Sequence, residues 1–240
     1  MVHGWGMAPD SLAGLESSLA EAFRVERLAL PGHGGAAARP GWTAALLARE
    51  WTRERPGALW LGWSLGALVA LAAAAVPGRV RGLVLVGATP CFRAAPDWPH
   101  GMDRASFAAF QADCAEDPER TLRRFLALQV RGDRHARTGL RRLRALAETG
   151  ARPDAAALTE GLRVLADTDL RAALPAVACP TVWISGAEDA LTQPAGARAA
   201  ARLQSRARVS CVPGAGHAPF ITHERNFVRL VHAALSELIA

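Results

Sequence analysis

The residues best suited to chemistry are a serine and its flanking glycines, in the segment Gly62-Trp63-Ser64-Leu65-Gly66. This G-x-S-x-G pattern follows a short apolar segment and precedes a long apolar run that begins at Leu65. A strand, a sharp turn and a helix in that order would hold the serine side chain exposed above a sheet. A serine hydroxyl attacks an ester carbonyl only when a neighbouring base takes its proton. The pattern therefore predicts that Ser64 is a catalytic nucleophile.

The base is expected late in the chain, because proteins with this serine turn carry the histidine after the acid. His217 lies in a glycine-rich loop, residues 213–220, after the last predicted strand. His223 and His232 fall in or beside the final helix, where a solvated histidine is the ordinary interpretation. We therefore predict that His217 is the general base.

The acid that orients the histidine should follow the preceding strand, where Glu188 and Asp189 are adjacent. Strand alternation cannot choose between neighbouring residues of a loop, so both stay candidates at this point. The oxyanion needs preorganised N–H donors, and the first is expected to be the N–H of Leu65. The second is expected to be the N–H of Trp5, in a loop at residues 3–6 whose glycines allow close approach to a substrate.

Short apolar segments alternate with longer helical ones, which predicts a mainly parallel sheet covered by helices on both faces. Between Met102 and Asp167 only amphipathic helical segments occur, as expected for an inserted all-helical cap. We divide the chain into a first core part (1–100), the cap (101–168) and a second core part (169–240). The predicted strands are 23–30, 58–62, 80–87, 180–186 and 207–213.

The composition limits the class of protein. The chain has 240 residues, of which 50% are hydrophobic and 21% charged, which suits a globular α/β domain and excludes a disordered or disulfide-rich chain. We expect a cytoplasmic protein, because no apolar stretch is long enough to span a membrane and no secretory signal is evident. The four cysteines are far apart with no CxxC pair, so no metal site is expected, and no motif predicts a cofactor.

Together these motifs resemble the α/β-hydrolase superfamily. More narrowly, the chain resembles the pimeloyl-[acyl-carrier protein] methyl ester esterases of biotin synthesis. The narrower likeness covers nearly the whole chain, cap included. It is carried by WLGWSLG at 60–66, TPCF at 89–92, WP at 98–99, RT at 120–121, RFLALQ at 124–129 and HAPFI at 217–221.

The resemblance implies an α/β-hydrolase fold and a triad of Ser64, Asp189 and His217, so it favours Asp189 over Glu188. It implies hydrolysis of the methyl ester of a pimeloyl chain attached to acyl carrier protein, with release of methanol. For the cap residues 125–129, ordinary helix packing is as good an interpretation as substrate binding. The implied substrate-binding residues are Trp5, Ser64, Leu65, Phe125, Leu126, Ala127, Leu128, Gln129 and His217.

The positive charge is concentrated in the cap. Residues 120–144 contain nine arginines and one acid, a net charge of +8, so the rest of the chain sums to −2. A solvated helix face is one interpretation; a docking surface for an acidic protein is the other. By resemblance, acyl carrier protein is the expected partner and Arg120, Arg124, Arg137 and Arg141 would contact it. The region lacks the interleaved aromatic residues typical of nucleic-acid binding, so we expect no nucleic-acid partner. We expect the protein to be a monomer.

Two alternatives stay open. The chain could be a general short-chain carboxylesterase or thioesterase that acts on small free esters, or a non-catalytic module that binds acyl carrier protein. Members of the resembled family carry strands upstream of the loop with which this chain starts. We therefore expect the N-terminal strands of the sheet to be missing, and either a natural start further upstream or a poorly stable product.

Overall fold

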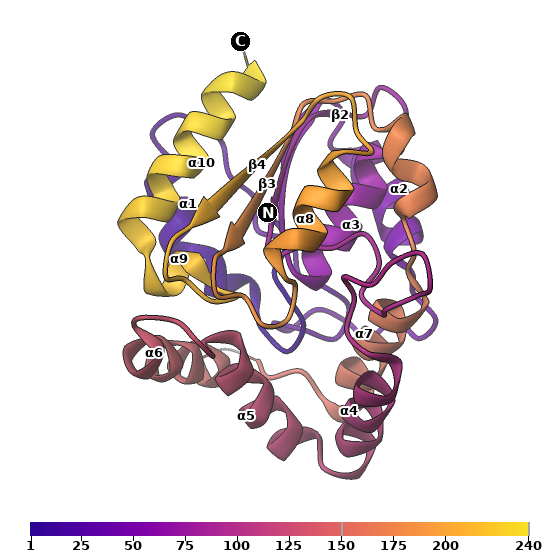
Figure 1. Cartoon of the computed structure of the whole chain (residues 1–240), viewed down its shortest axis with the longest axis vertical. Helices are drawn as coiled ribbons and strands as arrows, with labels where there is room; N and C mark the ends of the chain where they lie inside the picture. Colours follow the sequence, from indigo (N-terminus) through magenta and orange to yellow (C-terminus); the bar gives the residue numbers. More distant parts are fainter. Residues whose placement is uncertain (150, 240) are drawn as a thin grey trace.

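Four parallel strands form the central sheet of the computed structural model, which describes residues 1–149 and 151–239 (Figure 1). Each strand pairs in parallel with the next one along the chain. Four of the five predicted strands are confirmed, with ends that differ by one residue. In spatial order they are β1 (Ala58–Trp63), β2 (Val80–Val86), β3 (Thr181–Gly186) and β4 (Ala207–Val212).

Helices cover both faces of the sheet, as the alternating pattern predicted (Figure 1). Successive residues of β2 enter different hydrophobic clusters, Leu83 and Leu85 on one face and Val84 and Val86 on the other. A strand buried on both faces is typical of a parallel sheet. The helices α2 (Ala44–Glu54), α3 (Leu65–Ala74) and α8 (Pro194–Ala201) lie on one face; α1 (Ala13–Leu19) and α10 (Glu224–Ile239) lie on the other.

The strand predicted at residues 23–30 was wrong. In this segment only Leu28 forms a bridge, and its partner is the single residue Val2, which also bridges to Gly62 of β1. Val2 donates to the Leu61 carbonyl at 2.9 Å and accepts from the Trp63 N–H at 3.0 Å. Alternation in sequence reports a half-buried extended segment, whereas a strand also needs a neighbouring backbone along its length. In this structure the neighbouring backbone pairs with the segment 23–30 at one residue, Val2.

Four helices between β2 and β3 form the cap, which lies beyond the carboxyl ends of the strands (Figure 1). Three of them begin at an aspartate whose carboxylate accepts a backbone N–H of the first turn, an ordinary N-cap. The boundaries at residues 101 and 168 stay a prediction. The cap helices are α4 (Arg104–Glu116), α5 (Pro118–Gln129), α6 (Ala136–Glu148) and α7 (Ala155–Asp167).

Short helical turns complete the chain. The turns are η1 (Pro9–Leu12), η2 (Arg171–Ala176) and α9 (Pro219–Thr222).

Among the helices described, none is both long and apolar enough to cross a membrane.

Candidate active site

Ser64 occupies a strained turn between β1 and α3. Its φ of 55° and ψ of −117° make it the one non-glycine residue with positive φ in the described part of the chain. The backbones cross so closely that a Cβ on Gly62 would lie 2.4 Å from the Gly66 carbonyl oxygen, and one on Gly66 would lie 2.4 Å from that of Val2. Strain held in place by such packing is common at functional sites. The geometry is that of a nucleophile elbow.

His217 and Asp189 face each other in the interior. Nδ1 of His217 lies 2.8 Å from Oδ2 of Asp189, and neither side chain is more than 1% exposed. Asp189 also accepts the N–H groups of Leu191 and Thr192 on Oδ1, both at 2.9 Å, and the Thr192 hydroxyl on Oδ2 at 2.8 Å. Burial by itself would raise the pKa of Asp189, but attraction to His217 and these hydrogen bonds outweigh it and lower the pKa. The carboxylate is therefore ionised.

The other ring nitrogen of His217 is available for proton transfer. Nε2 is buried and has no hydrogen-bond partner among the residues described. Trp63, next to the serine, donates its indole N–H to the His217 carbonyl at 3.1 Å, so the two loops are joined. The adjacent carboxylate of Glu188 is exposed. The structure thus brings Asp189, and not Glu188, to the histidine.

The loop of residues 3–6 lies against the serine turn. A Cβ on Gly4 would lie 3.2 Å from Cβ of Ser64, so only a glycine fits this approach without displacement. The Trp5 side chain is buried and donates its indole N–H to the Leu158 carbonyl of α7 at 2.8 Å. Leu65 is the first residue of α3, and N–H groups of a first helical turn have no intrahelical partner. Leu65 and the loop that contains Trp5 therefore both lie next to Ser64.

Two buried histidines fix this loop from below. Nε2 of His3 accepts the Leu30 N–H at 3.1 Å, and Nε2 of His33 accepts the Gly6 N–H at 3.3 Å. Their Nδ1 atoms pair with the carbonyls of Gly4 and Pro31. Burial lowers the pKa of His33, and burial together with the neighbouring His33 lowers the pKa of His3 to about 3. The neutral imidazoles act as structural hydrogen-bonding groups.

A pH-dependent stability follows from His3. Below pH 6.5 the unfolded chain binds a proton at this residue, whereas the folded chain does so only near pH 3. The contribution is therefore complete above pH 6.5 and is lost as pH falls, by about 1.4 kcal/mol per pH unit. We expect His3→Gln to lose less stability than the wild type between these pH values, as measured by urea unfolding at several pH values. Parallel pH profiles would contradict this.

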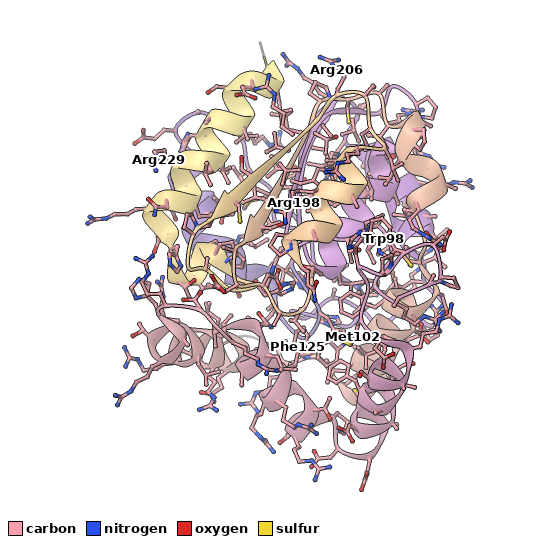
Figure 2. The ribbon with its side chains drawn as sticks, in the orientation of Figure 1. Trp98, Met102, Phe125, Arg198, Arg206 and Arg229 are labelled. Carbon is pink, nitrogen blue, oxygen red and sulfur yellow. The ribbon has the colours of Figure 1, made fainter. Side chains whose placement is uncertain are left out.

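The cap closes the site with an aromatic cluster. Phe125 of α5, labelled in Figure 2, packs edge-on against Trp5, with ring centroids 4.9 Å apart. Phe110 of α4 contacts both rings. Gln129 is buried, and its side-chain amide has no hydrogen-bond partner in the described structure. The backbone carbonyl of Gln129 accepts the backbone N–H of His217 at 2.8 Å. The end of α5 is thus attached to the loop that carries His217.

The other members of the predicted binding segment point elsewhere. Leu126 packs in the hydrophobic cluster on the α10 face, Leu128 is half-buried and Ala127 is exposed. Consecutive residues of a helix are about 100° apart, so a run of five cannot all face one site. Sequence reasoning also missed Thr192 and Phe110, which carry no motif and reach the site only through the fold.

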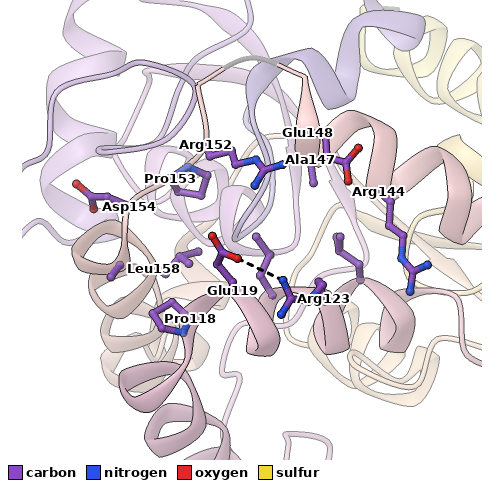
Figure 3. A pocket seen from close by; sticks show the side chains of 13 residues that line it. Pro118, Glu119, Arg123, Arg144, Ala147, Glu148, Arg152, Pro153, Asp154 and Leu158 are labelled. Carbon is purple, nitrogen blue, oxygen red and sulfur yellow. Dashed lines mark hydrogen bonds and ion pairs between the residues drawn. The ribbon is translucent and has the colours of Figure 1, made fainter.

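A separate cavity of about 410 Å³ lies between α5, α6 and the start of α7 (Figure 3). Leu122, Leu126 and Leu158 form part of its lining, and an ion pair of 3.3 Å joins Glu119 to Arg123 beside it. The lining of this cavity does not include Ser64, Asp189 or His217, the residues of the predicted triad.

The four arginines proposed for docking are exposed on α5 and α6. Arg120 lies 3.8 Å from Asp117 and Arg124 lies 2.6 Å from Asp113. No ion pair is found for Arg137 or Arg141 within the described residues. Surface ion pairs of this kind contribute little to stability, so most of this charge is available to a partner.

The comparison with known families decides the wider assignment. The model of the alpha/beta hydrolase family matches residues 1–230. The chain belongs to the alpha/beta hydrolase family. The arrangement of serine turn, acid and histidine described above is the one expected of a hydrolase of this fold.

Curated relatives of this hydrolase carry a more specific name. The chain is 43% identical over 244 residues to the pimeloyl-[acyl-carrier protein] methyl ester esterase of Stenotrophomonas maltophilia (strain R551-3), and the match covers 100% of this chain and 92% of the relative. It is 40% identical to the esterase of the same name from Xanthomonas campestris pv. campestris (strain B100), covering 99% and 94%.

Solved structures agree with the fold of this hydrolase. An esterase from Exiguobacterium antarcticum aligns with a TM-score of 0.86 at 21% identity, covering 100% of this chain and 91% of that one. A bromoperoxidase from Bacillus anthracis aligns with a TM-score of 0.87 at 19% identity, covering 98% and 90%. Within the described residues, no three His, Cys, Asp or Glu side chains are gathered as metal ligands would be.

Proposed function

We propose that this chain is a serine esterase that hydrolyses the methyl ester of pimeloyl-acyl carrier protein and releases methanol, as a step of biotin synthesis. The observation that carries the proposal is the full-length likeness to esterases of that name, at 43% identity, together with the buried pair of Asp189 and His217. A cytoplasmic location and a monomeric state remain predictions.

The proposed reaction uses the groups that these loops carry. Nε2 of His217 takes the proton of the Ser64 hydroxyl as its oxygen bonds to the ester carbonyl carbon. The N–H groups of Trp5 and Leu65 stabilise the oxyanion, and each such donor contributes roughly 10²–10³ in rate. His217 then gives the proton to the methoxy oxygen as the ester bond breaks. Methanol departs, and the acyl group stays bound to the Ser64 oxygen as an acyl-enzyme. Water, deprotonated by the same nitrogen, releases the free carboxylate and restores Ser64.

The cap supplies features suited to the acyl chain. The rings of Trp5, Phe110 and Phe125 form an apolar wall, and the unpartnered amide of Gln129 is a hydrogen-bonding group beside it. Ligand sites commonly combine an apolar lining with a few placed polar groups. We infer that the pimeloyl chain lies along this wall with its ester at Ser64.

Product analysis separates the proposal from its alternatives. With methyl pimeloyl-acyl carrier protein as substrate, the proposed reaction yields methanol and leaves the acyl group on the carrier. A thioesterase would instead release the acyl group from the carrier. A general carboxylesterase would cleave methyl pimelate as efficiently as the carrier-bound ester, and a binding module would cleave neither.

The docking surface gives a second test. Changing Arg120, Arg124, Arg137 and Arg141 to Glu should lower kcat/KM for the carrier-bound ester by about tenfold or more, because charge complementarity speeds association. The remaining rate should depend less on salt concentration. A small soluble ester should be hydrolysed at an unchanged rate.

The matched control makes the same change of charge away from the cap. Arg79, Arg202, Arg206 and Arg229 are exposed on the core, and Figure 2 shows Arg206 and Arg229 far from the cap. Their reversal to Glu should leave carrier-dependent activity close to that of the wild type. If both quadruple variants lose activity on the carrier-bound ester equally, docking on the cap is contradicted.

A further inference from the structure

The segment that joins α5 to α6 is hydrogen-bonded to the loop that carries His217. Arg134 donates its N–H to the Gly214 carbonyl at 2.9 Å, and His217 donates its N–H to the Gln129 carbonyl at 2.8 Å. Between them, Gly216 donates its N–H to Oδ2 of Asp133 at 2.7 Å. Two of these bonds use backbone acceptors, so Asp133 supplies the one side chain in this connection.

Asp133 is a buried carboxylate with a full set of donors. Its side chain has no exposed surface. Oδ2 accepts the Thr222 hydroxyl at 2.6 Å in addition to Gly216, and Oδ1 accepts the His135 N–H at 2.7 Å. Nδ1 of His223 lies 3.8 Å from Oδ2. Burying a carboxylate is costly unless hydrogen bonds or charges compensate it, and here its donors come from both the cap and the core.

On the cap side, the loop before His217 is held by these three hydrogen bonds, and Asp133 supplies the side-chain acceptor among them. Gly214 has a φ of 71° and Gly216 has no side chain, and a Cβ on Gly216 would lie 2.6 Å from the Gln129 carbonyl oxygen. Glycine residues bring conformational freedom that the surrounding structure must restrict. The bond to Asp133 holds the Ala215–Gly216 peptide, and the bond to the Gln129 carbonyl holds the next peptide, Gly216–His217.

We infer that Asp133 is a positioning residue for His217, through which the cap sets the place of the base. The inference rests on the proposed role of His217. Asp189 orients the ring, whereas Asp133, together with the Gln129 carbonyl, fixes the backbone from which the ring projects. Loss of this bond should lower kcat and leave KM nearly unchanged, because the substrate-contacting surface of the cap is retained.

The test compares Asp133→Ala and Asp133→Asn with the control Asp103→Ala. Asp103 is also a cap carboxylate that accepts a backbone N–H, that of Ser106 at 2.9 Å, but it lies at the start of α4, and among the described residues no hydrogen bond joins it to the His217 loop. The readouts are kcat and KM for a small soluble ester, the melting temperature, and the downfield ¹H NMR signal of the His217 Nδ1–H bonded to Asp189.

For Asp133→Ala we expect kcat to fall by about tenfold to a hundredfold, as displacement of a catalytic group by about 1 Å does. The downfield signal should broaden or vanish. In Asp133→Asn kcat should fall less but still measurably, because the amide keeps one acceptor oxygen while its NH₂ group must face an N–H donor, that of His135 or that of Gly216. The control should keep both kcat and the signal.

A folded Asp133→Ala protein with wild-type kcat and an intact signal would overturn the inference. If that variant does not fold, Asp133→Asn decides: unchanged kcat and signal overturn the inference, and a reduced kcat with a broadened signal supports it. Absence of any esterase activity in the wild type would instead refute the proposed function, while the NMR comparison would still test the position of His217.

Discussion

Replacing Ser64 by alanine should lower kcat for every ester substrate by roughly 10⁴- to 10⁶-fold. The reaction proceeds through an acyl group on the serine oxygen, so no step of the pathway survives its removal. The elbow backbone should persist, because alanine keeps the Cβ and the strain is held by the packing of Gly62 and Gly66. We therefore expect a folded protein with its melting temperature close to that of the wild type.

The measurement is burst release of p-nitrophenol from a short-chain p-nitrophenyl ester. Ser185→Ala is the matched control, because Ser185 is also buried, lies in β3 and has no hydrogen-bond partner for its hydroxyl among the described residues. This control should keep the full burst. If Ser64→Ala retains activity within about tenfold of the wild type, another nucleophile must act. A folded wild type without a burst would favour the binding-module alternative.

Local signals were enough to predict most of the fold. Apolar segments bounded by glycine and proline gave four strands, and the long apolar run after Ser64 gave α3. The segment 23–30 has the same alternation but no continuous neighbour, since Val2 alone pairs with Leu28. Alternation depends on which face of a segment meets water, whereas strand pairing depends on a distant part of the chain.

The site, like the fold, was predictable from sequence where its residues are close together in the chain. The serine turn is encoded in five consecutive residues, so its pattern is visible without the fold. Asp133 is separated from Gly216 by 83 positions, and no spacing rule connects them. The choice between Glu188 and Asp189 likewise depends on the direction in which a loop places each side chain, which only resemblance could suggest beforehand.

Changing Asp189 to asparagine should lower kcat by about 10⁴-fold without unfolding the protein. Oδ1 of Asp189 accepts two N–H groups, from Leu191 and Thr192, so the amide oxygen must take that place. The amide nitrogen is then placed at the position of Oδ2, facing Nδ1 of His217. An amide nitrogen can only donate, so His217 must accept on Nδ1 and carry its proton on Nε2.

A histidine in that tautomer cannot take the proton of Ser64. The reverse orientation of the amide is disfavoured, because its NH₂ group would face the Leu191 and Thr192 N–H groups. The measurement is kcat for a small ester, with the melting temperature as the test of folding. The matched control is Glu188→Gln, the same change at the exposed neighbouring position, which should keep wild-type kcat. A folded Asp189→Asn protein that keeps kcat within about tenfold would show that Asp189 does not set the tautomer.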